Sequence, residues 1–397
     1  MDAIEKTNVA QYIAQSGKEA CCGCAACEAV CPRHCVVMRP DSEGFLYPSV
    51  DESACIDCGK CVRTCSFRKP FQPYAPKQSY AFIHNDDLVR QQSSSGGVFT
   101  RLAMRVLHRG GVVFGASFDA EWQVRISYTE SVEGLQAFRG SKYVQASVGT
   151  AYADVKAFLR QGRLVLFSGS PCQVAGLHHF LGRNDDNLIT VDFACHGVPS
   201  PKVWAMYVKE KQREARSPLT RVYFRDKRWG WHGFHLTFCF KNNTVASQPQ
   251  NADLYMKAFL DNLTERPSCA ACKAKSGCSH SDITFADFWG LEHLMPELDD
   301  DKGASLVVVR TERGGALLDA QGKEFHRVDY AAALQYIPTL ETSSASSAKR
   351  ELFFKKLRRC RNVSRLINKT LYPLTVRQRI NICVYHWILR LKKLVSR

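Results

Sequence analysis

The stretch that decides the fold at the start of this chain is Cys21-x2-Cys24-x2-Cys27-x3-Cys31-Pro32, repeated as Cys55-x2-Cys58-x2-Cys61-x3-Cys65. In two-cluster iron–sulfur proteins this spacing lets three thiolates of one loop hold a [4Fe–4S] cluster, while the fourth thiolate reaches the neighbouring cluster. The doubled run therefore predicts two [4Fe–4S] clusters with exchanged fourth ligands. We expect one cluster on Cys21, Cys24, Cys27 and Cys65, and the other on Cys55, Cys58, Cys61 and Cys31.

Zinc is the main alternative, because pairs of CxxC motifs often form a closed four-thiolate zinc site. The third cysteine of each run and the CxxxC step do not suit a tetrahedral zinc pair. Disulfides fit less well, since nothing in the sequence points to secretion. Ser66 stands where a second proline is usual, and Cys22 and Cys35 are surplus thiols that either compete as ligands or fill space.

The composition is that of an ordinary soluble protein except for its cysteines. The chain has 397 residues with 45% hydrophobic and 23% charged residues, but it contains 18 cysteines. The first 20 residues lack the apolar core of a signal peptide, and no run of about 18 apolar residues predicts a membrane helix. We therefore expect a cytoplasmic protein whose reduced thiols serve metal or redox chemistry.

The positive charge is concentrated at the C-terminus. Residues 349–397 contain 15 Lys or Arg and one Glu, so they carry +14 of the net +16. No nucleic-acid-reading module accompanies this charge, so nucleic acid is not the expected partner. An amphipathic helix is predicted instead. This helix would bind to the anionic inner face of the membrane, to a partner protein, or to the α/β domain itself. Its apolar stripe is Val384, Trp387, Ile388, Leu391 and Val395.

Four regions follow from the pattern along the chain. Residues 1–68 form an α+β ferredoxin-like double-cluster module, residues 69–77 a proline-rich linker, residues 78–342 an α/β domain, and residues 343–397 a basic helical tail. Short apolar strands alternate with helices up to about residue 311, which predicts a largely parallel sheet. Within it, Arg221–Phe240 is expected to be an antiparallel insertion, serving either as a substrate rim or as a solvated hairpin.

A second set of cysteines follows the predicted strands. Cys172 and Cys195 each come just after one strand, and Cys269-x2-Cys272 lies on a loop before another. In open α/β sheets, ligands collect at the carboxyl ends of the strands. These four thiols either hold a third [4Fe–4S] cluster or belong to the packed interior, where cysteine is common.

Two loops are candidates for binding a cofactor. Ser93–Gly97 precedes a predicted helix at Val98, where serines could cap the helix and glycines could let a pyrophosphate approach the backbone. Gly140-Ser141-Lys142-Tyr143 offers a cation and an aromatic ring to a flavin edge. Taken alone, each stretch also fits an ordinary turn.

Together these segments resemble one family, the coenzyme F-420 hydrogenase/dehydrogenase beta subunits in the form with an N-terminal double ferredoxin. The resemblance covers roughly residues 20–312, and the bacterial form encoded among polysaccharide-synthesis genes is the most similar. It rests on six blocks in order: residues 94–99 (SSGGVF), 139–145 (RGSKYVQ), 167–173 (FSGSPCQ), 195–200 (CHGVPS), 224–227 (FRDK), and 281–284 with 287–290 (SDIT, DFWG).

The resemblance implies an FAD and a third [4Fe–4S] cluster in the α/β domain, which would then be a flavin- and cluster-binding domain. The implied cluster ligands are Cys172, Cys195, Cys269 and Cys272. The implied flavin contacts are Ser94, Ser95, Gly96, Gly97, Gly140, Ser141, Lys142 and Tyr143. The sequence departs from the family after the CxxC, where an extra Cys278 could replace one ligand and the usual arginine before residues 281–284 is missing.

The function expected from these features is a flavin- and iron–sulfur-dependent oxidoreductase. A low-potential donor such as reduced ferredoxin would pass electrons to the clusters, and FAD would pass them on to an organic substrate. The resemblance to the form encoded among polysaccharide-synthesis genes implies that this substrate belongs to polysaccharide biosynthesis. Lys142 would stabilise the reduced flavin, and His196 and Tyr143 are candidate proton donors, although His196 could equally contact cluster sulfur. The alternatives are an electron-transfer subunit that feeds a partner enzyme or coenzyme F-420, and a structural metal scaffold.

Overall fold

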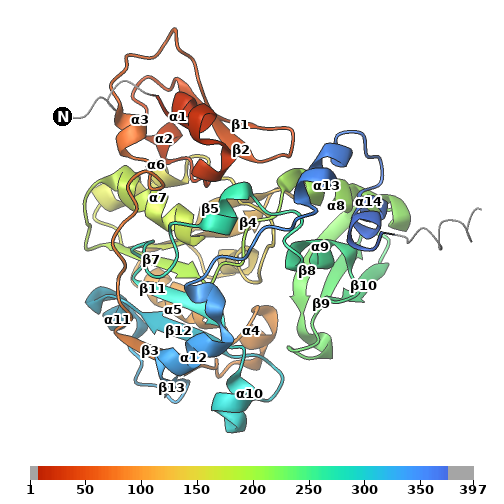
Figure 1. The fold of residues 1–397 in the computed structure, drawn as a ribbon. Coiled ribbons are helices and arrows are strands. Elements are labelled where there is room, and N and C mark those ends of the chain that lie inside the picture. The colour runs from red at the N-terminus through yellow and green to blue at the C-terminus, as the bar shows by residue number, and fades with distance from the viewer. Residues whose placement is uncertain (1–7, 374–397) are drawn as a thin grey trace, which may run out of the picture.

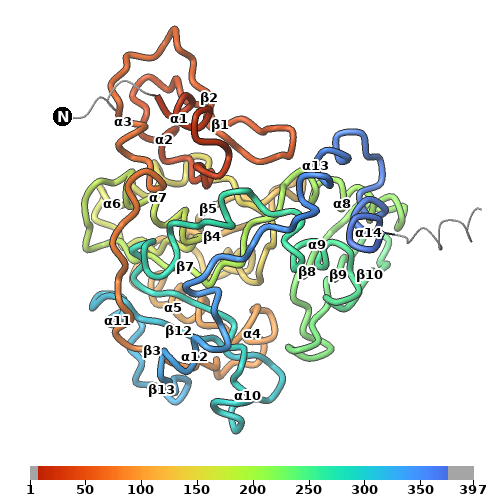
Figure 2. The backbone as a smooth tube through the Cα atoms, viewed as in Figure 1, coloured from red at the N-terminus to blue at the C-terminus, as the bar shows by residue number. Residues whose placement is uncertain are grey.

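The structure, a computed structural model, describes residues 8–373. Figure 1 shows three parts: an N-terminal segment at the top, a large sheet with its helices below it, and a lobe at the right built on β8, β9 and β10. The segment between the first two parts follows the side of the molecule down to β3 in Figure 2. The candidate site lies where these parts meet.

The N-terminal segment holds the two cysteine runs in similar local structures. Each run leads into a one-turn helix, and the residue before that helix is left-handed: Ala25 with φ 61° and Gly59 with φ 65°. Between the runs lies an antiparallel hairpin, whose turn is closed by the Asp41 carboxylate accepting hydrogen bonds from the Glu43 and Phe45 amides. The elements are α1 (Val9–Ser16), η2 (Lys18–Ala20), α2 (Ala26–Ala29), β1 (Val36–Pro40), β2 (Leu46–Val50) and α3 (Lys60–Arg63).

The proline-rich segment 69–77 packs on the main sheet domain. The Phe71 ring stacks on both His179 and His280, with ring centroids 4.1 and 4.0 Å away. The Arg310 guanidinium donates to the Tyr74 carbonyl oxygen at 2.6 Å. These contacts hold the segment along its path, so it does not behave as a free tether.

The main sheet has eight strands in the order β13-β3-β12-β11-β7-β6-β4-β5. Only the four central strands, β4, β6, β7 and β11, run parallel, and the outer strands pair antiparallel. The prediction of a largely parallel sheet is therefore wrong; the sheet is mixed. The strands are β3 (Gln78–Phe82), β4 (Val112–Phe118), β5 (Val124–Thr129), β6 (Val165–Ser168), β7 (Leu188–Phe193), β11 (Ile283–Asp287), β12 (Ser305–Val309) and β13 (Phe325–Arg327).

Burial explains that error. The strand β12 is buried along its whole length, yet it is antiparallel to both of its neighbours. A continuous apolar run reports a strand covered on both faces, and it does not report strand direction. Helices α5 (Val98–Leu107) and α11 (Glu312–Leu318) cover one face, and α6 (Ala151–Arg160) and α7 (Pro171–Leu181) cover the other.

Smaller helices complete the sheet domain: α4 (Asp87–Gln92), η3 (Glu133–Ala137), η5 (Pro267–Ala271), α10 (Leu291–Leu294), η6 (Pro296–Leu298), α12 (Tyr330–Tyr336) and η7 (Pro338–Leu340).

The lobe at the right has a large aromatic core. It is built from β8 (Leu219–Asp226), η4 (Lys227–Trp229), β9 (His235–Phe240), β10 (Val245–Pro249), α8 (Pro201–Ala215), α9 (Leu254–Leu260), α13 (Arg350–Leu357) and α14 (Val363–Leu371). Phe353, Phe354 and Ile367 of the last two helices are buried in the same core as Trp204. The first part of the basic tail thus packs on the protein itself, whereas the predicted stripe from Val384 lies outside the described residues.

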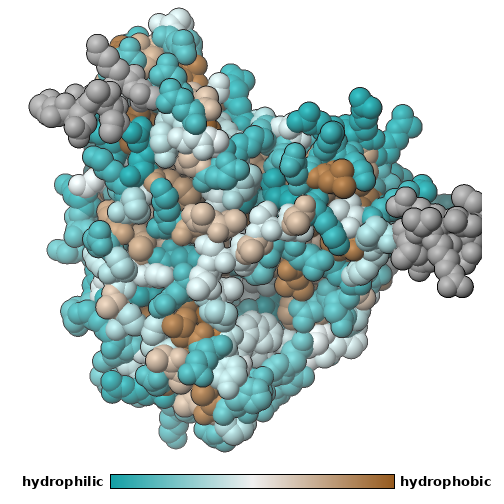
Figure 3. Space-filling model, in the orientation of Figure 1, coloured by the Kyte–Doolittle hydropathy of each residue, from teal (hydrophilic) through white to brown (hydrophobic). Residues whose placement is uncertain are grey.

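On the face drawn in Figure 3, apolar residues occur singly or in small groups among hydrophilic ones. None of the helices within residues 8–373 combines the length and the apolar character needed to cross a bilayer.

The N-terminal hairpin is anchored in the core of the lobe. Phe45, at the end of the β1–β2 turn, is fully buried and lies 6.2 Å from Phe354 of α13 between ring centroids. Arg350 of α13 pairs with Glu43 of the same turn. The C-terminal helices therefore fix the N-terminal segment over the sheet.

Replacing Phe45 with alanine should weaken this anchor. Removing a fully buried aromatic ring costs about 3–5 kcal/mol, so the free energy of unfolding should fall by that amount in anaerobic urea denaturation. Val37→Ala on β1 of the same hairpin is the control, because Val37 is 41% exposed and should change stability by less than about 0.5 kcal/mol. Equal losses in the two variants would contradict the proposed anchor.

Candidate functional site

The structure gathers the cysteines into three groups. The inner N-terminal group is Cys21, Cys24, Cys27 and Cys65. Burial, followed by the charge of the Cys24 thiolate, raises the pKa of Cys65 to about 11, and the same two causes raise the pKa of Cys27. Four mutually close thiols form the donor set that a [4Fe–4S] cluster requires, and the predicted ligand set for this site consists of the same four residues.

The outer N-terminal group lies around one surface cleft. Cys31, Cys55, Cys58 and Cys61 line this cleft together with the surplus Cys35. The sulfurs of Cys31 and Cys35 are 3.4 Å apart, and burial, followed by that contact, raises the pKa of Cys35 to about 12. The outer group therefore offers five thiols. The fifth, Cys35, lies beside the four predicted ligands although the cysteine spacing did not predict it as a ligand.

The third group forms at the carboxyl ends of the central strands. Cys172 lies in the first turn of α7 after β6, Cys195 follows β7, and Cys269 and Cys272 come from the loop at η5. Burial, then the charges of the other three thiols, raises the pKa of Cys195. Cys278 lies apart from them, half-buried beside Arg310. The structure thus brings together the four residues named from the sequence and leaves out the fifth.

The three groups follow one another in space. Cys61 of the outer group is close enough to contribute to the raised pKa of Cys27 in the inner group. A Cβ on Gly176 of α7 would lie 3.0 Å from the Cys24 sulfur, so the helix whose first turn contains Cys172 packs directly on the inner group. Cys22 lies between them, and its hydrogen bond lowers the pKa of Cys172 to about 7. The order is therefore outer, inner, third.

A large cavity of about 470 Å³ opens beside the third group. Cys172 and Cys195 lie in its wall, and both candidate flavin loops contribute to its lining. The wall of this cavity is mostly apolar but also carries several polar and charged residues, and a space of this size is typical of cofactor and ligand sites. Of the expected flavin contacts, those that line it are Ser94, Ser95, Gly97, Gly140, Ser141, Lys142 and Tyr143.

Contacts between the two loops shape this wall. The Ser94 hydroxyl oxygen accepts from the Ser141 amide at 2.6 Å and lies 2.7 Å from the Ser141 hydroxyl.

The two glycines of the first loop have different roles. Gly97, with φ 91°, is the N-cap of α5, and no side chain caps that helix, so the prediction of a serine cap is wrong. Gly96 faces away from the cavity: a Cβ there would lie 2.1 Å from the Phe82 carbonyl oxygen. Packing alone requires glycine at that position.

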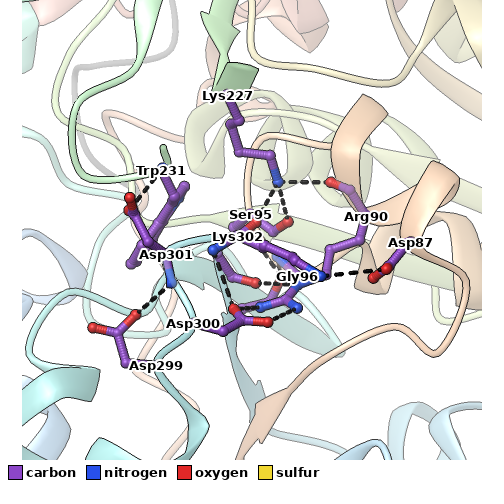
Figure 4. A network of polar contacts seen from close by, with 12 residues as sticks. Asp87, Arg90, Ser95, Gly96, Lys227, Trp231, Asp299, Asp300, Asp301 and Lys302 are labelled. Atoms are coloured by element: carbon purple, nitrogen blue, oxygen red, sulfur yellow. Dashed lines mark hydrogen bonds and ion pairs between the residues drawn. The ribbon is translucent and has the colours of Figure 1, made fainter. Parts of the chain in front are cut away.

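A polar network in Figure 4 fixes the first loop from outside. The Lys227 ammonium, at the tip of the β8–β9 hairpin, donates to the carbonyl oxygens of Arg90 at 2.6 Å, Ser95 at 2.9 Å and Lys302 at 2.8 Å. Arg90 in turn donates to Asp300. The insertion Arg221–Phe240 therefore holds the Ser93–Gly97 loop in place. This is a third role, besides the substrate rim and the solvated hairpin considered from the sequence.

Part of the same insertion reaches the cavity itself. Arg225 and Phe234 line the cavity, whereas Trp229 is half-exposed and stacks on His235 outside it. The Arg225 guanidinium pairs with Asp287 and donates to the Tyr143 hydroxyl at 3.3 Å. The insertion thus divides into an inner face that contributes to the site and a solvated outer face.

The candidate catalytic residues differ in their surroundings. Lys142 donates to the carbonyl oxygens of Arg139 and Gly140, and burial lowers the pKa of its ammonium to about 7. Tyr143 stacks on Phe259 at 4.7 Å. Burial also lowers the pKa of His196, whose Nε2 is buried without a partner and whose Nδ1 lies 3.3 Å from the Ser344 hydroxyl. All three side chains belong to cavity-lining residues.

Sequence reasoning missed two residues that connect the parts. Arg266 is buried beside the inner group and donates to the Cys21 carbonyl oxygen at 2.7 Å. Gln145 accepts from Arg266 at 3.1 Å and donates to the Cys22 carbonyl oxygen at 3.1 Å. Arg266 belongs to no motif, so no local signal identified it; Gln145 ends one of the six blocks, but its partners are distant in sequence.

Cys195→Ala should remove one cluster and leave the other two. We expect iron and acid-labile sulfide each to fall by about four from about twelve per chain, measured on anaerobically prepared protein. Cys239→Ala is the matched control, because Cys239 lies on β9 among Arg228, Arg221 and Asp226. An unchanged iron content in the Cys195 variant would show that this thiol holds no cluster.

The lowered pKa of Lys142 should make stability depend on pH. Its folded pKa of about 7 lies below the usual value of about 10.4, so between these values the unfolded chain binds the extra proton and stability rises with pH. Lys142→Met removes this cost and should therefore stabilise the protein more at about pH 6.5 than at about pH 9.5. Urea denaturation at both pH values, with the exposed Lys209→Met as control, tests this; a pH-independent difference would contradict it.

Comparison with known proteins gives three findings. Residues 162–329 match the family model for the C terminus of the beta subunit of coenzyme F420 hydrogenase/dehydrogenase. Over 164 residues the chain is 24% identical to one subunit of the F(420)H(2) dehydrogenase of Methanosarcina mazei, an alignment that covers 39% of this chain and 46% of that relative. The chain thus spans about half the length of this curated relative.

The third finding is a solved structure of the F420-reducing [NiFe] hydrogenase complex from Methanosarcina barkeri. It aligns with a TM-score of 0.45 at 18% identity, over 76% of this chain and 92% of the other. The family match covers the part of the chain that supplies all four thiols of the third group. Residues 162–329 of the chain are therefore similar to the C-terminal part of the beta subunits of coenzyme F420 hydrogenase/dehydrogenase.

Proposed function

We propose that this protein is an electron-transfer subunit that carries electrons along three [4Fe–4S] clusters to a flavin in the cavity. The observation that carries the proposal is the order of the thiol groups, outer, inner and third, ending at the wall of a cavity of about 470 Å³. A series of single-electron sites that leads to a cofactor-sized space supports transfer between a one-electron donor and a two-electron carrier.

The family favours a subunit over an enzyme that acts alone. The family model describes a beta subunit, and the matched relative is named as a subunit of F(420)H(2) dehydrogenase. We therefore place the handover to a partner enzyme or to coenzyme F420 ahead of a substrate bound by this chain. The oxidoreductase with its own organic substrate remains the second candidate, because the cavity leaves room beside the third group.

The residues fit the cofactors by their chemistry. Each thiol group supplies at least four cysteines, and the inner group has a buried cation, Arg266, beside it that suits an anionic cluster. When bound, the clusters exchange single electrons and the flavin converts between one- and two-electron transfer. The Ser94–Ser141 contact and the Gly140 backbone would hold the cofactor, with Ser95, Gly97 and Tyr143 along the same wall.

Lys142 is positioned to control charge in the cavity. Its ammonium lacks a carboxylate partner among the described residues and is bonded only to two carbonyl oxygens. A cavity-facing cation stabilises negative charge that develops on a bound ring system. His196, whose Nε2 is buried without a partner, would act as a hydrogen-bond partner at the third group, and Tyr143 would orient Arg225.

The donor side of the route is the outer group. Cys55, Cys58 and Cys61 are partly exposed around the surface cleft, and Ile56 beside them is 59% exposed. A partner protein can therefore approach this group closely, whereas Cys24 of the inner group is buried against α7. Electrons would enter at the outer group from a one-electron donor and leave through the cavity.

Anaerobic preparation of the whole chain tests the proposal. We expect about twelve iron atoms, about twelve sulfides and about one flavin per chain, and reduction of the protein by reduced methyl viologen. Reduction of added coenzyme F420, or of a partner's acceptor, should then follow and should be lost in Cys172→Ala.

Other outcomes separate the alternatives. Turnover of an organic acceptor by the chain alone, with no transfer to coenzyme F420 or to a partner, would support the second candidate. Bound zinc in place of iron and sulfide would support the metal scaffold and reject electron transfer.

A further inference from the structure

Arg266 is a buried cation that reaches from the third thiol group to the inner one. It lies three residues before Cys269, and its backbone carbonyl accepts from the Cys269 amide at 3.0 Å. Its side chain extends in the other direction and donates to the Cys21 carbonyl oxygen at 2.7 Å and to the Cys21 sulfur at 3.5 Å. One residue thus contacts a ligand position of the inner group and the backbone of the third.

The charge of this guanidinium has no carboxylate to balance it. Arg266 is 1% exposed and forms no ion pair among the described residues. Its remaining donors go to neutral oxygens, those of Leu46 at 2.9 Å and Gln145 at 3.1 Å, and its central carbon lies 4.1 Å from the centre of the Tyr47 ring. A buried charge without a partner is costly, so an anionic group beside Arg266 would be strongly favoured.

The local backbone is shaped to admit this side chain. Gly23, in the loop between Cys21 and Cys24, has φ 71°, and a Cβ there would lie 2.8 Å from Arg266 Nη1 and 2.7 Å from the Gln145 amide nitrogen. Glycine is therefore needed both for the left-handed turn and for the close approach of the cation. The cysteine loop and Arg266 fit each other, although Cys21 and Arg266 are 245 residues apart.

We propose that Arg266 raises the reduction potential of the inner cluster, so that this cluster accepts an electron from the outer cluster and holds it next to the third. The inference rests on the proposed function, since it assumes a cluster at the inner group. Reduction adds one negative charge to the cluster and breaks no bond. A fixed buried cation that hydrogen-bonds a ligand sulfur stabilises the more negative form, and net charge and bonds to sulfur are known to set such potentials.

Arg266→Gln tests the charge, and Arg266→Lys tests whether charge alone is enough. Dithionite titration of the full chain, followed by electron paramagnetic resonance, should show one of the cluster transitions in Arg266→Gln shifted to lower potential. We expect its equilibrium constant for reduction to fall at least about tenfold, which is about 59 mV for one electron. In Arg266→Lys the shift of that transition should be less than half as large. Arg266→Met is a second neutral variant in case Arg266→Gln does not fold.

The matched control is Arg63→Gln. Arg63 also donates to a cysteine carbonyl oxygen, that of Cys58 at 2.7 Å, but it is exposed at the outer group, where solvent screens its charge. Its variant should leave all transitions in place. Iron and sulfide counts accompany every sample, so that loss of a cluster is not mistaken for a shift.

The outcomes are distinguishable. Unchanged potentials in a fully loaded Arg266→Gln protein would overturn the inference and leave the electron-transfer function standing. An equal shift in the Lys and Gln variants would also overturn it, since charge would then not be the cause. Loss of iron from the neutral variants without any shift would make Arg266 only a structural support. Wild-type protein without iron and sulfide would reject the proposed function itself.

Discussion

The contact on which the arrangement depends is the packing of the first cysteine loop on α7. Gly176 has no side chain, and this lets the Cys24 sulfur approach the helix whose first turn contains Cys172. An alanine at that position would place its Cβ 2.9 Å from the Cys24 Cβ, which is closer than packed atoms allow. Cys24 belongs to the inner thiol group and α7 carries Cys172 of the third. This contact therefore sets the distance between the inner and third thiol groups.

The rest of the protein holds that contact in place from a distance. The β1–β2 hairpin inserts Phe45 into the aromatic core of the lobe, and Arg350 from α13 pairs with the same turn. On the far side, Lys227 fixes the loop at Ser95 that lines the cavity. The insertion and the C-terminal helices therefore act as supports for the site, even though most of their residues lie outside it.

Charge is distributed to match these roles. The described tail carries its positive charge on α13, on α14 and on the turn between them, and the apolar sides of both helices are buried. Most of its Lys and Arg residues are exposed on the surface of the lobe, whereas Arg350 pairs with Glu43. Inside, two buried cations and one half-buried cation each have a defined neighbour: Arg225 with Asp287, Arg266 with Cys21, and the half-buried Lys142 with backbone oxygens. Low dielectric makes each of these internal charges count for more than a surface charge.

The sequence by itself determined the parts of the protein that depend on near neighbours. The two N-terminal thiol groups and the helix at Val98–Leu107 could be predicted because their spacing acts over a few residues. The cysteines that follow β6 and β7 could be placed at one edge because parallel strands end together.

Only the tertiary structure decided the direction of the outer strands, the exclusion of Cys278, and the meeting of Arg266 with Cys21. Apolar runs carry no information on strand direction, and a hydrogen bond between residues far apart in sequence leaves no local pattern. Such contacts arise only when packing brings distant segments together.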